Sequence, residues 1–213
     1  NQLSNICQKI PNADVDDVAS AIGLDPRIGK LFLNAGPGYG GSCLPKDMKA
    51  LINFADSIGI KPTFLNEVEK TNQNQCINII SLIEKKIGNV NKKRITILGT
   101  SFKPETDDVR DSISIKLIKK LVEKGARITI HDPKAIENTR KIFLKKIEYK
   151  KSIIDSLDKS QCAIIMTQWK EYSKITNSTI RKMNRKIIID SRRVLVEKDI
   201  DADYQAIGIG NNK

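Results

Sequence analysis

Apolar residues in the first part of the chain recur at the three- and four-residue spacing of an amphipathic helix. Asp14 precedes one such stretch over residues 15–22, which a glycine ends, so a capped helix is expected there. The same spacing predicts helices over residues 46–57 and, as one long element, over residues 64–87. Residues 1–10 resemble the end of a helix that begins before them. Helices therefore dominate this part of the chain.

The pattern changes beyond a polar link at residues 89–94. Apolar, β-branched runs of strand length follow, separated by helical spacing such as that over residues 113–124. These runs lie at residues 94–102, 127–131, 162–167, 186–190 and 204–209. Strands that alternate with helices predict a parallel, Rossmann-like sheet whose ligands bind beyond the carboxyl ends of the strands. We therefore expect an α/β protein with an all-helical domain over residues 1–92 and a sheet domain over residues 93–213.

The net charge leaves two classes of partner open. The 37 Lys and Arg residues exceed the 25 Asp and Glu residues, which gives a net charge of +12. Such an excess suits nucleic acid. However, the lysine pairs of the second half are not interleaved with aromatic residues, which make up 5% of the chain. A small phosphorylated substrate fits the charge equally well, and we expect no nucleic-acid partner.

Hydropathy and cysteine usage favour a reducing, aqueous compartment. No apolar run approaches the roughly 18–20 residues that span a bilayer, and the first residues do not resemble a secretory leader. We therefore expect no membrane partner and a cytoplasmic protein. The cysteines form no CxxC pair and no zinc-like spacing with the single histidine, His131, so no metal site is expected. Cys7, Cys76 and Cys162 lie in apolar-periodic stretches and are expected in the core.

Cys43 lies in a different setting, the glycine-rich segment GPGYGGSCLPKD of residues 36–47. The glycines match GxGxxG, but the neighbourhood is helical and lacks the preceding strand, so a dinucleotide-binding loop is not favoured. We interpret the glycines as a close approach of the backbone to a ligand. They bring Cys43 to a helix that begins near Pro45, where the helix dipole and Lys46 favour a thiolate. Asp47 can orient the thiol or a water. The alternative is a glycine-rich turn around an inert, buried cysteine.

GGSCLPKD is similar to the active-site motif of the UDP-glucose and GDP-mannose dehydrogenase family. Further segments resemble that family in the same order, at residues 12–29, 99–112, 166–169 and 190–195. The resemblance implies oxidation of a sugar alcohol to a carboxylic acid with two NAD molecules. The segments at 132–134 and 167–169 favour the UDP-glucose branch over the GDP-mannose branch. Ser42 argues against the branch that acts on N-acetylated sugars.

The resemblance also implies roles for single residues. Cys43 corresponds to the catalytic nucleophile, and Asp47 to a residue implicated in water activation. Lys46 and Arg110 correspond to residues near NAD. The residues that correspond to substrate contacts are Arg27, reaching the site of a partner subunit, and Phe32, Leu33, Tyr39, Gly40, Phe102, Lys103 and Arg192.

Plainer roles stay open for three of these residues. Without the resemblance, Lys103 and Arg192 fit exposed charges at strand ends. Arg110 with Asp107 and Asp108 fits a surface ion pair that contributes little energy.

The implied reaction runs through Cys43. A first hydride transfer gives the C6 aldehyde of the sugar, to which the thiolate adds as a thiohemiacetal. A second hydride transfer gives a thioester, and water releases the acid. Covalent capture keeps the reactive aldehyde from escaping between the two oxidations.

The family's NAD-binding domain has no counterpart in this chain, because segment 95–99 carries a strand and one glycine but not the rest of the fingerprint. We therefore interpret the chain as a C-terminal part of a family member and expect it not to catalyse alone. The first domain is expected to bury its apolar faces in a homodimer, where Arg27 completes the neighbour's site. The alternatives are a GDP-mannose dehydrogenase and a module that binds a nucleotide sugar without catalysis.

Overall fold

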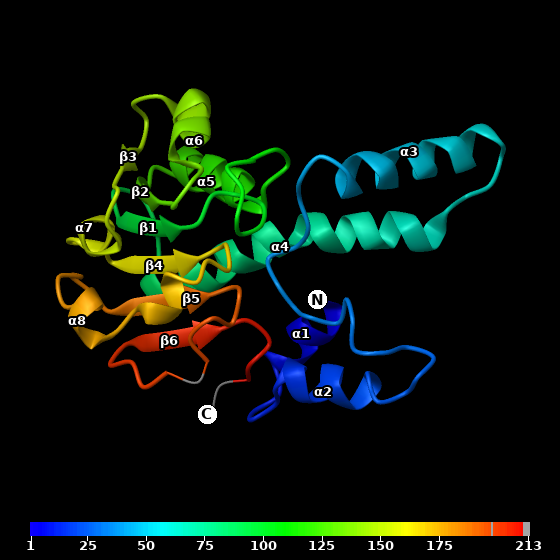
Figure 1. Cartoon of the computed structure of the whole chain (residues 1–213), viewed down its shortest axis with the longest axis horizontal. Coiled ribbons are helices and arrows are strands. Elements are labelled where there is room, and N and C mark those ends of the chain that lie inside the picture. The colour runs from blue at the N-terminus through cyan, green and yellow to red at the C-terminus, as the bar shows by residue number, and fades with distance from the viewer. Residues whose placement is uncertain (197, 211–213) are drawn as a thin grey trace.

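The computed structural model describes residues 1–196 and 198–210. Its centre is a six-stranded sheet of strand order β3-β2-β1-β4-β5-β6, in which every neighbouring pair is parallel (Figure 1). The strands are β1 (Arg94–Leu98), β2 (Arg127–His131), β3 (Glu148–Tyr149), β4 (Cys162–Ile165), β5 (Ile187–Asp190) and β6 (Asp203–Ala206). The chain reverses direction across the sheet between β1 and β4, which is where such sheets bind ligands. The expected α/β class is confirmed.

Helices cover both faces of this sheet. They are α5 (Ile113–Glu123), α6 (Ile136–Phe143), α7 (Ile153–Leu157) and α8 (Asn177–Ile180), with a 3-10 turn, η1 (Tyr172–Lys174). Side chains that point to opposite faces of a strand belong to two separate cores. Ile95 and Ile97 of β1 lie in the core under α5, and Leu98 lies in the core under α7 and α8. Because both faces are covered, the central strands are apolar at consecutive positions rather than alternating.

The first part of the chain is helical, as expected. Its helices are α1 (Gln2–Cys7), α2 (Val15–Ile22), α3 (Leu44–Ser57) and α4 (Thr63–Ile87). Asp14 caps α2, since its carboxylate accepts a hydrogen bond of 2.8 Å from the Asp16 amide. Pro45 lies in the first turn of α3, where a missing amide hydrogen costs nothing.

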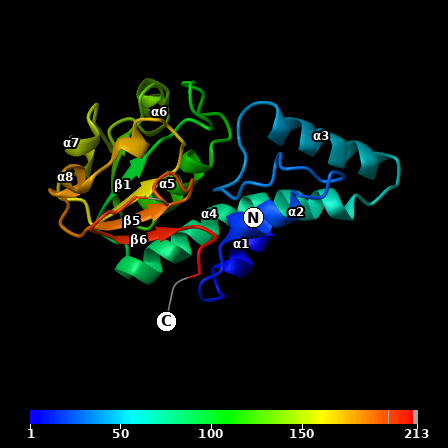
Figure 2. The ribbon, with the colours of Figure 1, turned by 60° about the horizontal axis from the view of Figure 1, so that its bottom comes forward.

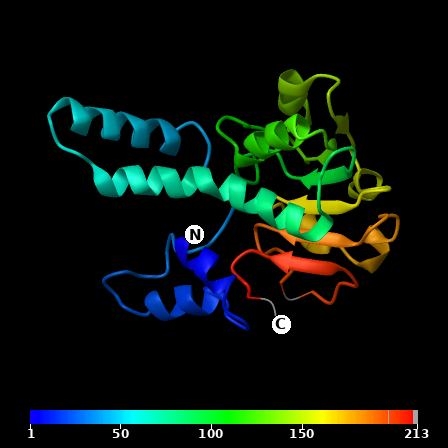
Figure 3. The ribbon, with the colours of Figure 1, turned by 180° about the vertical axis from the view of Figure 1, so that it is seen from behind.

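The two halves of α4 lie in different surroundings. Its second half contributes Cys76, Ile79, Ile80 and Ile83 to one of the two sheet cores. Its first half pairs with α3 in an arm that projects away from the sheet (Figures 1 and 3). Pro45 is the one buried residue of α3. The domain boundary between residues 92 and 93 remains a prediction. It assigns all of α4 to the first domain, although the second half of α4 packs in a core of the sheet domain.

The helices α1 and α2 lie beside β6 and residues 207–210 (Figure 2). The Val15 amide donates to the Gly208 carbonyl at 2.9 Å, and Asp14 and Ile209 form an isolated antiparallel bridge. Arg193 follows β5 and binds the Asp14 carboxylate at 2.7 Å and that of Asp16 at 2.8 Å. The Arg193 side chain is 7% exposed, whereas the Asp16 side chain is 55% exposed, so the ion pair is shielded from solvent on the arginine side alone and links α2 to the residues after β5.

Candidate active site

The glycine-rich segment forms a loop between α2 and α3 that crosses the carboxyl-end side of the sheet. Gly38 has φ +108° and Gly41 has φ +89°, backbone conformations that residues with a side chain rarely adopt. A Cβ atom on Gly38 would lie 2.4 Å from Asn72 Oδ1, and one on Gly41 would lie 2.7 Å from the Phe102 ring. The glycines therefore allow the loop to pack between α4 and the segment after β1.

Tyr39 is held at three points by α4. Its backbone amide donates to Asn72 Oδ1 at 2.8 Å, and its carbonyl accepts from Asn72 Nδ2 at 3.1 Å. The Tyr39 hydroxyl donates to Glu69 Oε2 at 2.9 Å. Burial raises the pKa of Tyr39 to about 12, and the hydrogen bond to Glu69 acts in the same direction. Tyr39 is therefore a neutral donor at physiological pH.

Cys43 is the residue immediately before α3, and its thiol is exposed. The buried position that the alternative gave to this cysteine is thus wrong. Its carbonyl accepts from the Asp47 amide at 2.8 Å, whereas its side chain caps no helix amide. Ser42 Oγ lies 3.6 Å from the sulfur, and Lys46 and Asp47 form an exposed ion pair of 3.2 Å beside it. A thiol at a helix start next to a lysine is the setting of a reactive cysteine.

The other three cysteines, Cys7, Cys76 and Cys162, are buried as expected. Burial raises the pKa of the Cys162 thiol to about 12, so this cysteine is chemically quiet at neutral pH.

Arg110 approaches the same loop from the segment after β1. Its carbonyl accepts from the Gly41 amide at 2.9 Å. Its guanidinium binds the Asp108 carboxylate through Nε at 3.0 Å and Nη2 at 2.7 Å. The Asp108 carboxylate raises the pKa of Arg110, and Cys43 contributes in the same direction. The surface ion pair left open by the sequence is therefore present, and the same arginine is an electrostatic neighbour of Cys43.

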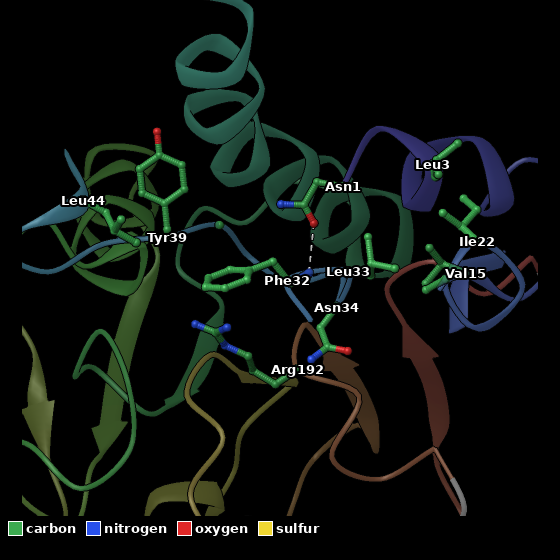
Figure 4. Close-up of a pocket in the computed structure, with 13 residues that line it drawn as sticks. Asn1, Leu3, Val15, Ile22, Phe32, Leu33, Asn34, Tyr39, Leu44 and Arg192 are labelled. Atoms are coloured by element: carbon green, nitrogen blue, oxygen red, sulfur yellow. Dashed lines mark hydrogen bonds between the residues drawn. The ribbon is translucent and has the colours of Figure 1, made fainter. Parts of the chain in front are cut away.

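A cavity of about 400 Å³ lies between this loop, the two N-terminal helices and the end of β5 (Figure 4). It is lined by Asn1, Leu3, Val15, Ala19, Ile22, Phe32, Leu33, Asn34, Gly36, Gly38, Tyr39, Leu44 and Arg192. The Gly36 amide donates to Asn1 Oδ1 at 2.9 Å across one side of it. Four of the predicted substrate contacts therefore share one cavity: Phe32, Leu33, Tyr39 and Arg192.

Among the described residues that line this cavity, Arg192 has the one charged side chain. Its backbone amide donates to Asp190 Oδ1 at 3.0 Å, and its Nε donates to the Met166 carbonyl at 2.9 Å. Burial lowers the pKa of Arg192 to about 10, which leaves it cationic at neutral pH. No carboxylate pairs with it within residues 1–196 and 198–210. An unpaired, partly buried guanidinium at the end of a parallel strand suits an anionic ligand group such as a phosphate.

Two predicted contacts, Phe102 and Gly40, lie beside the cavity rather than in its wall. The Phe102 ring packs on Gly41, and a Cβ on Gly40 would lie 2.6 Å from the Asp111 carbonyl oxygen. Both residues share a narrow crevice with Arg192. Lys103 Nζ lies 5.5 Å from the centre of the Phe102 ring, within reach of a cation–π contact.

Arg27 is not brought to this cavity. Its guanidinium binds Asp25 Oδ2 at 2.6 Å, and its side chain is 87% exposed. Phe32, which does line the cavity, is 98% exposed and has φ +62°.

Sequence patterns had missed the wall supplied by α1 and α2. Leu3, Val15, Ala19 and Ile22 reach the cavity because α2 docks on the end of β6 and on Arg193. Their spacing predicted an apolar helix face, but nothing local says what that face covers. Asn72 was missed for a similar reason, since a polar residue within a helix gives no local sign of its partner.

The described residues do not form a dinucleotide-binding site of the Rossmann type. Gly99, which follows β1, packs its α-carbon against Thr167 and is not followed by a glycine-rich turn. The acidic residue that follows β2 is Asp132, and both of its carboxylate oxygens already accept hydrogen bonds from the protein. Its Oδ2 accepts the Thr100 amide at 2.7 Å, and its Oδ1 accepts the Ala135 amide at 2.7 Å. A ribose hydroxyl would find no free carboxylate there.

Within residues 1–196 and 198–210 the structure has neither a metal-binding cluster nor a membrane-spanning helix. No three or more His, Cys, Asp or Glu side chains of that part of the chain gather in a way that could hold a metal ion. No helix there is long and apolar enough to cross a membrane.

Residues 1–74 match the central domain of the UDP-glucose/GDP-mannose dehydrogenase family, and residues 96–197 match its UDP-binding domain. The UDP-glucose 6-dehydrogenase AglM of Haloferax volcanii is 38% identical over 207 residues, which cover 97% of this chain and 47% of that protein. The UDP-glucose 6-dehydrogenase TuaD of Bacillus subtilis is 34% identical over 212 residues, covering 98% and 46%.

A UDP-glucose dehydrogenase structure from the hyperthermophilic archaeon Pyrobaculum islandicum superimposes with a TM-score of 0.89 at 32% identity. The match covers 98% of this chain and 46% of that one. The chain thus spans about half the length of the relatives that it matches.

Proposed function

Since this chain belongs to the UDP-glucose/GDP-mannose dehydrogenase family, we propose that it supplies the nucleophile and the nucleotide-sugar pocket of an NAD-dependent enzyme that oxidises UDP-glucose to UDP-glucuronate. One observation carries this proposal. The exposed thiol of Cys43 lies at the start of α3, on the loop whose earlier residues, Gly36 and Gly38, line a cavity. The same cavity is lined by the guanidinium of Arg192, which pairs with no carboxylate of the described residues.

Each part of the site then has a chemical task. Arg192 and the loop backbone bind and orient the nucleotide sugar, with Phe102 and Lys103 at the edge of the pocket. Cys43 adds to the C6 aldehyde, and the carbon–sulfur bond retains it as a thiohemiacetal until oxidation gives a thioester. Asp47 activates the water that hydrolyses the thioester and releases the carboxylate and the thiol.

In this scheme NAD is the hydride acceptor. The described residues offer Lys46 and Arg110 beside Cys43, but their fold forms no Rossmann-type site for the dinucleotide. We therefore expect that this chain alone does not reduce NAD when UDP-glucose is added. Steady formation of NADH by the 213-residue chain would contradict that expectation.

The choice of UDP-glucose rests on two supports. Relatives with 34–38% identity carry that name, and segments 132–134 and 167–169 resemble the UDP-glucose branch. The second candidate is GDP-mannose, because its dehydrogenases share the GGSCLPKD motif. A nucleotide-sugar-binding module without catalysis is disfavoured by the intact sequence from Cys43 to Asp47.

We also propose a homodimer formed through the arm of α3 and α4. The arm exposes large apolar side chains that a monomer would leave in water, namely Leu44, Leu51, Phe54, Ile58, Ile60 and Phe64. Exposed apolar surface of this extent is typical of a protein–protein interface. In such a dimer Arg27, which is outside the cavity of its own chain, reaches the neighbouring site.

Calorimetric titration of the chain with UDP-glucose and with GDP-mannose tests the proposed substrate. We expect selective binding of UDP-glucose and at least about a tenfold loss of affinity in Arg192→Ala, because a charge-assisted hydrogen bond contributes roughly 1.5–3 kcal/mol. Lys103→Ala should weaken binding less, since Lys103 lies outside the cavity. Lys145→Ala, an exposed lysine at the other edge of the sheet, is the matched control and should bind normally.

The other outcomes are equally informative. A preference for GDP-mannose would replace the substrate and keep the family chemistry. Equal affinity of wild type and Arg192→Ala would remove the proposed anion site from this cavity.

A further inference from the structure

Asn72 is a buried polar residue in the middle of α4 that no sequence motif singles out. It is 5% exposed. Its amide oxygen and nitrogen both bind the backbone of one residue, Tyr39, at 2.8 Å and 3.1 Å. A carboxamide that accepts from an N–H and donates to a C=O of the same residue fixes that residue as a strand partner would. Asn72 is buried and Tyr39 is half-buried, so both hydrogen bonds are partly shielded from water and losing them is costly.

Gly38, next to Tyr39 in the sequence, leaves the space that the Asn72 side chain occupies. A Cβ on Gly38 would lie 2.4 Å from Asn72 Oδ1, so only glycine fits there while Asn72 keeps its place. Glu69, one turn earlier on the same face of α4, accepts the Tyr39 hydroxyl at 2.9 Å. The loop and this face of α4 are therefore complementary in both shape and hydrogen bonding.

Tyr39 lies at the centre of the loop between the cavity and the thiol. Gly36 and Gly38 before it line the cavity, and Cys43 follows four residues later at the start of α3. Beyond Tyr39 and before Cys43, a backbone hydrogen bond from the Gly41 amide to the Arg110 carbonyl is the one that ties the loop to the sheet domain among the residues that the structure describes. Fixing Tyr39 therefore fixes the cavity wall and the approach of Cys43 together.

The anchor itself is rigid because α4 continues into the sheet domain. Ile79, Ile80 and Ile83, two to three turns beyond Asn72, are at most 5% exposed and belong to a sheet core. Arg192 extends from the end of β5 in the same sheet. The helix α4 therefore contacts the loop before Cys43 through Asn72 and packs against the sheet through its second half (Figure 3). It thereby fixes the position of the loop relative to the sheet that carries Arg192.

We propose that Asn72 is the positioning residue that places the glycine loop, and through it Cys43, relative to the nucleotide-sugar cavity. The proposal rests on the proposed function, in which Cys43 is the nucleophile. Asn72 touches neither the cavity nor the thiol, so it acts only through Tyr39 and is not itself catalytic.

Hydrogen exchange of the chain, followed at the Tyr39 amide and at residues 36–43, tests this role. In Asn72→Ala we expect the protection factor of the Tyr39 amide to fall at least about tenfold, as expected for a buried hydrogen bond. The thermal midpoint should fall far less than that of a core variant. Asn74→Ala is the matched control, because Asn74 is an exposed asparagine on the same helix. Its loop should exchange as in wild type.

Asn72→Asp separates positioning from simple loss of packing. An ionised carboxylate keeps the acceptor for the Tyr39 amide but cannot donate to the Tyr39 carbonyl, whereas a protonated carboxyl can do both. The loop of this variant should therefore be less protected at pH 7 than at pH 4, after correction for the intrinsic exchange rate. A role in packing alone would give no such recovery.

A second readout links the loop to the site. UDP-glucose should slow alkylation of Cys43 by iodoacetamide in wild type and in Asn74→Ala, and should slow it several-fold less in Asn72→Ala. Unchanged Tyr39 protection in Asn72→Ala would overturn the positioning role even if wild type binds UDP-glucose. A loosened loop in a chain that binds no nucleotide sugar would instead uphold the positioning role and reject the proposed function.

Discussion

At the scale of single residues, Asp132 organises the carboxyl-end side of the sheet. Its Oδ2 accepts the amides of Thr100 and Ser101, and its Oδ1 accepts those of Lys134 and Ala135. Trp169 Nε1 also approaches Oδ2, at 3.4 Å. One buried carboxylate thus ties together the segments that follow β1, β2 and β4, and the last of these includes Met166, whose carbonyl holds Arg192.

Replacing Asp132 with asparagine should destabilise the fold. The new amide would turn an NH₂ group toward two backbone N–H donors, so at least two buried hydrogen bonds are lost. We expect the free energy of unfolding to fall by about 2–4 kcal/mol. Urea denaturation measures this, with Asp155→Asn as the control because Asp155 is exposed. A loss below about 1 kcal/mol would show that the segments hold together without the carboxylate.

His131, the single histidine of the chain, should give stability a pH dependence of its own. Burial lowers the pKa of His131 below its ordinary value of 6.5. The unfolded chain therefore binds a proton near pH 6.5, before the folded chain does, so the stabilisation is complete above that pH. It is lost as the pH falls toward the lower folded pKa, by at most about 1.4 kcal/mol per pH unit.

Urea denaturation of wild type and His131→Asn between pH 7.5 and pH 5.5 measures that effect. The wild-type free energy of unfolding should decline across this range, and the slope should flatten in the variant. Equal slopes would mean that the folded histidine titrates normally.

At the scale of elements, the second half of α4 has one face in a sheet core and one face exposed to solvent. Ile83 is fully buried in that core, whereas Ile77, less than two turns earlier, is 51% exposed. Ile83→Ala should lower the free energy of unfolding by about 2–5 kcal/mol, because it leaves a cavity in a packed core. Ile77→Ala is the matched substitution on the same helix and should change it by less than about 1 kcal/mol. Equal losses would mean that the helix is packed alike on both sides.

The sequence predicted long, strongly periodic elements well and short ones poorly. Helices α2, α3 and α4 fall within two residues of the expected ranges, because each carries a cap, a proline or a continuous apolar stripe. Strand β3 has only two residues, Glu148 and Tyr149, so no periodicity can show it. The run at 162–167 was expected to be a strand throughout, but β4 ends at Ile165 and the remainder forms part of the loop that binds Arg192.

The candidate site divides in the same way. Residues of one continuous motif, from Tyr39 to Cys43, were recognisable because glycine, proline and cysteine have distinctive roles at that spacing. Asn72 and the apolar residues of α2 enter the site through tertiary packing alone. The sequence shows that Asn72 is polar and that the α2 residues are apolar, but it does not show which residues they contact.

At the scale of the whole molecule, the arm of α3 and α4 exposes an apolar surface to solvent. Phe54 on α3 is 61% exposed within a row of other exposed apolar residues. If the proposed dimer forms through this arm, Phe54→Asp should shift the chain to monomer, because a buried, unpaired carboxylate is costly. Sedimentation velocity measures the change.

Leu144→Asp is the control for that experiment. Leu144 is 65% exposed but lies just before β3, at the far edge of the sheet from the arm. A wild-type chain that sediments as a monomer at micromolar concentration, or a Phe54→Asp variant that remains dimeric, would rule out an interface centred on this residue.

The docking of α2 on Arg193 and Gly208 also sets an order of events during synthesis. The partners Asp14 and Arg193 are separated by 179 positions in the sequence. The ribosome makes α1 and α2 well before β6, so the surface on which they dock is not complete until β6 and the residues after it have emerged. Contacts between such distant segments form late in folding. The helices that wall the cavity are therefore made long before the segment on which they dock, so a nascent chain that stalls before β6 would have the glycine loop and Cys43 but no closed pocket.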